Sequence, residues 1–202
     1  MKLRILPKSK FITTIELDDD RYGILPIKQI SSLYPVGYSD EISPDAATEI
    51  IQLLKDYAFN LLVSYLAKEE RCKYQCFLYL HKKGFHQEII QDAIQRCLKL
   101  NYINEQRFAE LLISSYINRK ASKRVIISKL SANRIPSYIW KPLLEKLYTE
   151  EEIINNLEEM LNKYCSAHRD LPPEKLKERA FGYLYRKGFD ADDIRSALEN
   201  LL

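Results

Sequence analysis

The chain has 202 residues, and its 31 Lys and Arg nearly balance its 28 Asp and Glu. Hydrophobic residues make up 46% and charged residues 29%, a composition that excludes an intrinsically disordered chain. No run approaches the roughly 18 apolar residues of a membrane span, and the N-terminus lacks the apolar stretch of a signal peptide. We therefore expect a cytoplasmic protein whose four cysteines are reduced thiols.

Residues 1–44 differ from the rest of the chain. Two β-rich runs, 11–17 and 22–27, flank the acidic break at 18–21, and this pattern predicts a β-hairpin. Ser43 followed by Pro44 is typical of a helix N-cap and first helical position. We expect 1–44 to form a small hairpin or cap segment ahead of a helical chain, and we assign it no role.

The remaining residues are predicted to be helical, because apolar residues recur at helical spacing. The first helices are expected over 45–67, 73–83 and 87–99, with Gly84 and the region of Asn101 as stops. Residues 104–107 open a helix that continues through Tyr116. Ser122 and Ser137 are expected to cap helices over 123–132 and 138–148. The last helices are expected over 150–165, from 171–173 to 187, and over 191–202.

An internal repeat organises these helices. Leu80, Leu130 and Leu184 each precede a turn, and apolar residues follow Phe85, Ile135 and Phe189 at +5, +8, +9 and +13. These anchors are Ile90, Ala93, Ile94, Leu98; Trp140, Leu143, Leu144, Tyr148; and Ile194, Ala197, Leu198, Leu202. Periods of about fifty residues indicate stacked helical modules. We expect a mainly α fold in which three-helix repeats (45–101, 102–149 and 150–202) form a curved, elongated solenoid behind the hairpin.

Basic residues cluster in the middle repeat without an acidic residue among them. They are Arg119, Lys120, Lys123, Arg124, Lys129 and Arg134. Arg71, Lys82 and Lys83 occupy comparable places in the first repeat, and Arg186 and Lys187 in the third. The middle cluster begins at a helix N-terminus, a position able to bind phosphates or carboxylates. The alternative is a solvated helical face, which is the common role of surface charge.

The sequence contains few residue patterns that are typical of catalytic or metal-binding sites. The sequence has no phosphate-binding loop, no nucleophile elbow and no His-Glu-x-x-His motif, and its three histidines have no partner spacing. Cys72 and Cys76 form one Cys-x3-Cys pair without the second pair of a structural zinc site. We expect no enzymatic activity, no cofactor and no metal.

Residues 102–109, Tyr-Ile-Asn-Glu-Gln-Arg-Phe-Ala, resemble a signature of the RecX family, whose members regulate the RecA recombinase. Residues 66–85 and 119–135 are similar to other segments of that family, so the resemblance spans about residues 55–202. The chain departs from the family pattern in places: Cys72 replaces an N-cap serine, and Arg134 stands where a glycine is usual. Within the signature, we expect Arg107, Phe108 and Ala109 to form a structural packing motif.

The resemblance implies a regulator, most simply an inhibitor, that lies in the groove of the RecA–single-stranded DNA filament. It would limit filament growth, ATP turnover and strand exchange through the basic residues named above. The expected partners are the RecA filament and single- or double-stranded DNA, with no membrane and no small-molecule substrate, and the protein would act as a monomer. The alternatives are a direct DNA-binding protein of helix-turn-helix type and a general interaction scaffold. Acidic and apolar starts of the third helices argue against base readout.

Overall fold

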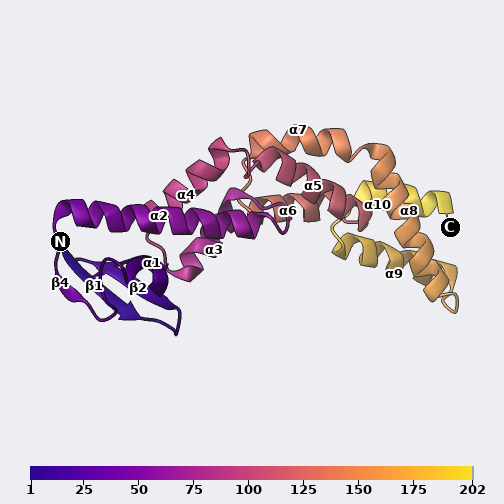
Figure 1. The fold of residues 1–202 in the computed structure, drawn as a ribbon. Helices are drawn as coiled ribbons and strands as arrows, with labels where there is room; N and C mark the ends of the chain where they lie inside the picture. Colours follow the sequence, from indigo (N-terminus) through magenta and orange to yellow (C-terminus); the bar gives the residue numbers. More distant parts are fainter. Residues whose placement is uncertain (202) are drawn as a thin grey trace. The chain divides into compact units, whose positions relative to one another are not determined.

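A computed structural model describes residues 1–201, with the side chains of residues 1–199 (Figure 1). Within this range the chain forms four strands and ten helices, so the fold is mainly helical with a small N-terminal sheet. The chain divides into two compact units, of which the first is Met1–Asn104 and the second begins at Glu105.

The sheet is larger than the predicted hairpin. The hairpin is present as β2 (Ile12–Leu17) and β3 (Asp20–Pro26), which are antiparallel. It pairs with β1 (Lys2–Pro7), which in turn pairs with β4 (Ser39–Glu41), giving the order β3-β2-β1-β4. The one-turn helix α1 (Ile27–Ile30) follows β3. β1, β4 and α1 were not predicted.

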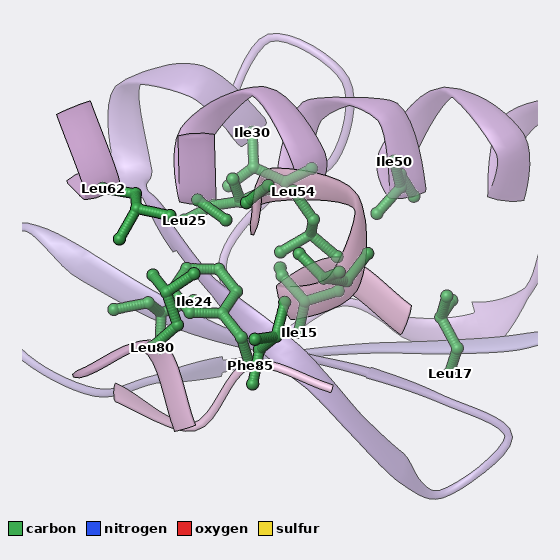
Figure 2. Packing of buried hydrophobic residues seen from close by; sticks show 14 of the residues in the cluster. Ile15, Leu17, Ile24, Leu25, Ile30, Ile50, Leu54, Leu62, Leu80 and Phe85 are labelled. Carbon is green, nitrogen blue, oxygen red and sulfur yellow. The ribbon is translucent and has the colours of Figure 1, made fainter. Parts of the chain in front are cut away.

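The sheet shares one hydrophobic core with the first helices, α2 (Pro44–Leu66), α3 (Lys73–Lys83) and α4 (Gln87–Lys99). Figure 2 shows Ile15 and Ile24 of the sheet gathered with Leu54 of α2 and with Phe85 from the α3–α4 turn. A Cβ atom on Gly23 would lie 2.6 Å from the Phe85 ring, so only glycine allows the strand this close. Residues 1–44 are therefore part of the first unit's core.

The second unit contains six helices: α5 (Glu105–Asn118), α6 (Lys123–Ala132), α7 (Ser137–Leu147), α8 (Glu150–Ala167), α9 (Pro173–Arg186) and α10 (Ala191–Leu201). All predicted helices are present. Ser43 and Ser122 cap α2 and α6, as predicted. The prediction for Ser137 was wrong: Pro136 is the N-cap, because its fixed extended backbone places Ser137 in the first turn.

The repeat is visible in the burial of its anchors. Leu80, Leu130 and Leu184 are fully buried, as are the residues four positions before them. Trp140 and Leu143 are only half-buried, and Leu202 lies outside the described residues. The turn after each leucine contains a left-handed residue: Gly84 (φ 89°), Arg134 (φ 56°) and Gly188 (φ 88°). In the middle repeat Arg134 therefore adopts the left-handed conformation that glycine adopts in the other two turns.

Candidate functional site

The turn between α3 and α4 gathers basic residues from two parts of the first unit. Lys82 and Lys83 end α3, and the carbonyl oxygen of Lys83 accepts hydrogen bonds from Arg21 Nη2 at 3.1 Å and from Lys8 Nζ at 3.4 Å. The last carbonyls of a helix attract cations, because they lack partners within the helix and the helix dipole is negative there. The predicted Lys82 and Lys83 are thus joined by Lys8 and Arg21, which sequence reasoning missed.

This cluster of four cations is not neutralised. Partial burial, followed by the charges of Arg21 and Lys83, lowers the pKa of Lys8 from its ordinary value of 10.5. Across the described part of the chain, no carboxylate forms an ion pair with Lys8, Arg21, Lys82 or Lys83. The positive potential at this turn is therefore available to an anionic partner.

A ladder of rings and cations leads from the same turn along the first unit. Lys83 Nζ lies 4.9 Å from the centre of the Tyr79 ring, and Tyr79 stacks on Tyr65 at 4.1 Å with an angle of 1° between planes. The guanidinium of Arg71 lies 4.7 Å from the other ring of the pair, that of Tyr65. Arg71 also forms an ion pair with Glu69. Cation–π contacts fix the long basic side chains against the rings.

The second unit contains a similar ladder. Lys187 lies 5.6 Å from the Tyr183 ring, Tyr183 stacks on Tyr164 at 4.8 Å, and Tyr164 stacks on His168 at 4.2 Å. Lys187 and Tyr183 occupy the same repeat positions as Lys83 and Tyr79. In α5 and its following turn, Arg119 lies 5.6 Å from the Tyr116 ring. Each three-helix group thus holds at least one predicted cation on a tyrosine.

The middle cluster is partly compensated by an acid from far along the chain. Lys120 donates a hydrogen bond to Glu159 of α8 at 2.8 Å, and this bond, opposed by desolvation, lowers the pKa of Glu159. Lys123 and Arg124 are exposed at the start of α6 and form no ion pair within the described residues. The accessible positive charge is therefore at Lys123 and Arg124 rather than at Lys120.

The start of α6 lies against the α9–α10 turn. Ser122 caps α6 and donates its hydroxyl hydrogen to the carbonyl oxygen of Lys187 at 2.9 Å. A cavity of about 520 Å³ lies beside these two segments, and its lining includes the cations Lys123 and Arg124 and the carboxylates Asp190 and Asp193. Burial, and then Asp190, Asp192 and Glu150, raise the pKa of Asp193. This mixture of signs gives the cavity no clear preference for an anion.

The remaining predicted residues are dispersed. Lys129 is exposed on α6, Arg134 is exposed in the following turn, and the Arg186 guanidinium lies beside Gly182 of its own helix. Phe108 and Ala109 are buried in the second unit, and Arg107 is half-buried beside them in sequence. The basic residues thus form separate groups on the two units instead of one contiguous patch within either.

Burial raises the pKa of two cysteines, Cys97 and Cys165. Burial raises the pKa of Cys97 to about 11, so its thiol stays protonated at neutral pH and is a poor nucleophile. Cys72, Cys76 and Cys97 are buried and all four cysteines are free. Among the described residues, no group of three or more His, Cys, Asp or Glu is placed to hold a metal ion. The described helices include none with the length and apolar character needed to span a membrane.

The fold and the site together define a helical-repeat protein that carries cations on tyrosine rings. Two family models match the chain: the first three-helix domain of RecX over residues 58–97, and the third over residues 150–198. The regulatory protein RecX of Streptococcus uberis is 28% identical, over all of this chain and 77% of its own length. That of Caldanaerobacter subterraneus is 27% identical, over 71% of this chain and 68% of its own length. The chain belongs to the RecX family and is a RecX-type regulatory protein.

Comparison with solved structures supports the fold over nearly all of the chain. A crystal structure of a regulatory protein RecX has a TM-score of 0.71 to this protein at 16% identity, over 98% of this chain and 99% of the other. The alignment with the Streptococcus uberis relative likewise includes the N-terminal sheet. The similarity is therefore wider than the resemblance over residues 55–202 that the sequence motifs indicated.

Proposed function

We propose that this protein acts in the cytoplasm as a monomer that binds the groove of a RecA filament on single-stranded DNA. Bound there, it limits filament growth, ATP turnover and strand exchange, and so restrains homologous recombination. Membership of the RecX family supports this function, as do relatives that bear the name regulatory protein RecX.

The observation that carries the proposal is the recurrence of a cation on a tyrosine ring. Lys83 on Tyr79, Arg119 on Tyr116 and Lys187 on Tyr183 present one such pair in each three-helix group. A filament is a repeating partner, and repeated weak contacts on one chain reinforce each other through high effective concentration. Rings that already hold the basic side chains reduce the entropy lost on binding.

The proposed contact residues are those predicted from the sequence. They are Arg71, Lys82, Lys83, Arg119, Lys120, Lys123, Arg124, Lys129, Arg134, Arg186 and Lys187. Lys123 and Arg124 are the most informative to change, because they are exposed and free of ion pairs among the described residues. Changing Lys120 would also break its bond to Glu159, which confounds binding with folding.

The test is the DNA-dependent ATPase of the cognate RecA, titrated with this protein. We expect inhibition at amounts well below the concentration of DNA sites, and we expect Lys123→Glu/Arg124→Glu to require roughly tenfold more protein, since two phosphate or carboxylate contacts are reversed. Lys141→Glu/Lys146→Glu is the matched control, because it makes the same charge change at exposed positions of α7. Equal loss in both variants would show that only net charge matters, and an unaffected ATPase with wild-type protein would refute the proposal.

The competing function is direct binding to duplex DNA, with helix-turn-helix motifs that contact the bases. The third helices of the first and last groups start with carboxylates, Glu88 in α4 and Asp192 and Asp193 in α10. Acids at these positions repel phosphates where a recognition helix would enter the major groove. Tight, salt-sensitive binding to duplex DNA together with no effect on RecA would favour this competing function.

A further inference from the structure

A second surface lies on the N-terminal sheet, at the β1–β2 turn. The turn contains Lys8 and Lys10 followed by Phe11, whose side chain is 68% exposed. Lys10 Nζ lies 5.5 Å from the centre of the Phe11 ring. A phenylalanine this exposed contributes little to the core, and its ring, with Lys10 beside one face, is accessible to a partner.

The turn is anchored beside the basic end of α3. Lys8 reaches the Lys83 carbonyl oxygen, which also accepts a hydrogen bond from Arg21. Lys8 and Arg21 are sufficient to satisfy the Lys83 carbonyl oxygen. Lys82 and Lys83 add two further positive charges in the last turn of α3. The excess positive charge is not explained by the helix end alone, which carries only about half an elementary charge.

The strand and the helix end form a preorganised support. The backbone N–H of His86 donates to the carbonyl oxygen of Tyr22 at 2.9 Å, and the two rings stack at 4.7 Å. A side chain on Gly84, in the left-handed conformation, would collide with the Arg21 guanidinium. Surfaces that are already ordered lose little entropy when a ligand binds.

We propose that this surface binds single-stranded nucleic acid. The cations hold successive phosphates while one unpaired base stacks on Phe11; the surface consists of Lys8, Lys10, Phe11, Arg21, Lys82 and Lys83. Proteins that bind single strands without sequence preference combine cations along the phosphate backbone with aromatic rings on which bases stack, because every base has a π-face. In a duplex the bases are already stacked, so Phe11 gains nothing there.

The choice of single-stranded DNA as the ligand rests on the proposed function. The new element is a DNA-binding surface to which residues 1–44 contribute. The DNA-binding measurements use no recombinase, so a failure of this proposal can be told from a failure of the proposed function. The measurement is fluorescence anisotropy with a labelled oligothymidylate of about 20 nucleotides, longer than the roughly 4–16 nucleotides that one such site covers.

The decisive variants either remove the aromatic ring of residue 11 or retain it. We expect Phe11→Leu to bind the oligothymidylate about tenfold more weakly, the contribution of one stacked base, and Phe11→Tyr to bind as wild type. Lys8→Ala/Lys10→Ala should reduce the slope of log affinity against log salt by about 1.4, from roughly 0.7 for each lost phosphate contact on a single strand. Leu33→Ala is the control for loss of an exposed apolar side chain in the same unit.

A second readout follows the stacking directly. Trp140 is the single tryptophan of the chain, so Phe11→Trp in a Trp140→Phe background reports on position 11 alone. We expect its fluorescence to be quenched by the oligothymidylate and unchanged by duplex DNA of the same length.

Three results would overturn the proposal: no binding of wild-type protein to the single strand, equal affinity of Phe11→Leu and wild type, or the same loss by Phe11→Leu on duplex and single strand. Variants that bind DNA normally but no longer inhibit RecA would instead assign the surface to a protein partner, which also overturns it. Circular dichroism and melting of each variant confirm that it is folded.

Discussion

Single residues decide the turns that follow Leu80, Leu130 and Leu184. Each turn needs one residue with φ near +56° to +89°, a region that glycine adopts without strain. Arg134 adopts it with a side chain, as does Lys120 (φ 58°) before α6. Backbone strain at such positions costs about 1–3 kcal/mol and persists only where the surrounding packing requires the turn.

Two glycines in the third repeat, Gly188 and Gly182, allow the cost of a side chain at positive φ to be measured. We expect Gly188→Ala to reduce the free energy of unfolding by about 1–3 kcal/mol, because φ is 88° and the new Cβ would lie 2.8 Å from Ser122 Oγ. Gly182→Ala is the matched control. It lies within α9 and its Cβ would meet only the flexible Arg186 guanidinium at 3.3 Å, so helix propensity should raise stability by about 0.5–1 kcal/mol.

Urea unfolding followed by circular dichroism measures both changes. A Gly188→Ala protein as stable as wild type would contradict both the left-handed backbone at residue 188 and its close approach to Ser122.

Sequence reasoning at this scale found the positions of the turns but not their partners. Gly84 and Gly188 were recognisable from the sequence, whereas the ion pair of Lys120 with Glu159 joins residues 39 positions apart. The tyrosines that hold cations were equally hidden, because Tyr65 and Tyr183 have the same helical spacing as core residues. Nothing in a single sequence distinguishes a ring that only packs from one that also faces a lysine.

At the scale of elements, Arg96 joins α4 to α2. Its guanidinium donates to Asp56 Oδ1 at 2.8 Å and lies 4.1 Å from the centre of the Phe59 ring. The hydrogen bond from Arg96, opposed by desolvation, lowers the pKa of Asp56 from its ordinary 3.8. Both carboxylate and arginine are partly exposed, so screening by water keeps the ionic contribution small.

We expect Arg96→Ala to lose about 1–2 kcal/mol at neutral pH, from the cation–π contact and the ion pair together. The lowered pKa of Asp56 means that the ionic part is fully present above the ordinary pKa and is lost as the pH falls through the lowered value. The stability difference from wild type should therefore shrink in acid without vanishing, because the Phe59 contact remains.

The control is Arg195→Ala, which removes an exposed pair with Asp192 within one helix and only a long contact, 6.0 Å, with the Phe181 ring. It should cost less than about 0.5 kcal/mol. Chemical denaturation at neutral and acidic pH supplies both numbers. A pH-independent difference would show that the ion pair contributes nothing.

Helices were the most predictable elements because their apolar spacing extends over several turns. β1 and β4 were missed for different reasons. β1 has the alternating Leu3 and Ile5 but is interrupted by basic residues, Lys2 and Arg4. β4 is a polar edge strand of three residues, defined only by its pairing with β1. Long-range pairing of this kind has no local signal.

At the scale of the molecule, the sheet belongs with the first three-helix group. Leu3, Ile5 and Ile15 are buried in the same core as Leu54 and Leu80. The chain therefore divides after Asn104 rather than after residue 44. The curved, elongated arrangement expected from the repeat stays a prediction.

Fragments test this division. We expect residues 1–104 expressed alone to unfold cooperatively in urea with native-like circular dichroism, since they contain their whole core. Residues 44–104, without the sheet, should fail to do so because Leu54, Leu80 and Phe85 would lose their partners on the strands. A cooperative transition in the shorter fragment would show that the sheet is dispensable for the core.

The sheet contacts the first three-helix group at the same carbonyl position that the second group contacts in the third. The Lys187 carbonyl is bound by Ser122, the cap of a helix in the preceding repeat, and the equivalent Lys83 carbonyl is bound by Lys8 and Arg21 of the sheet. The sheet thus takes the place that a preceding repeat would occupy, and it covers the apolar surface that stacking would otherwise bury. The first three helices therefore bury their apolar residues against strands of their own unit, without needing a preceding repeat for this purpose.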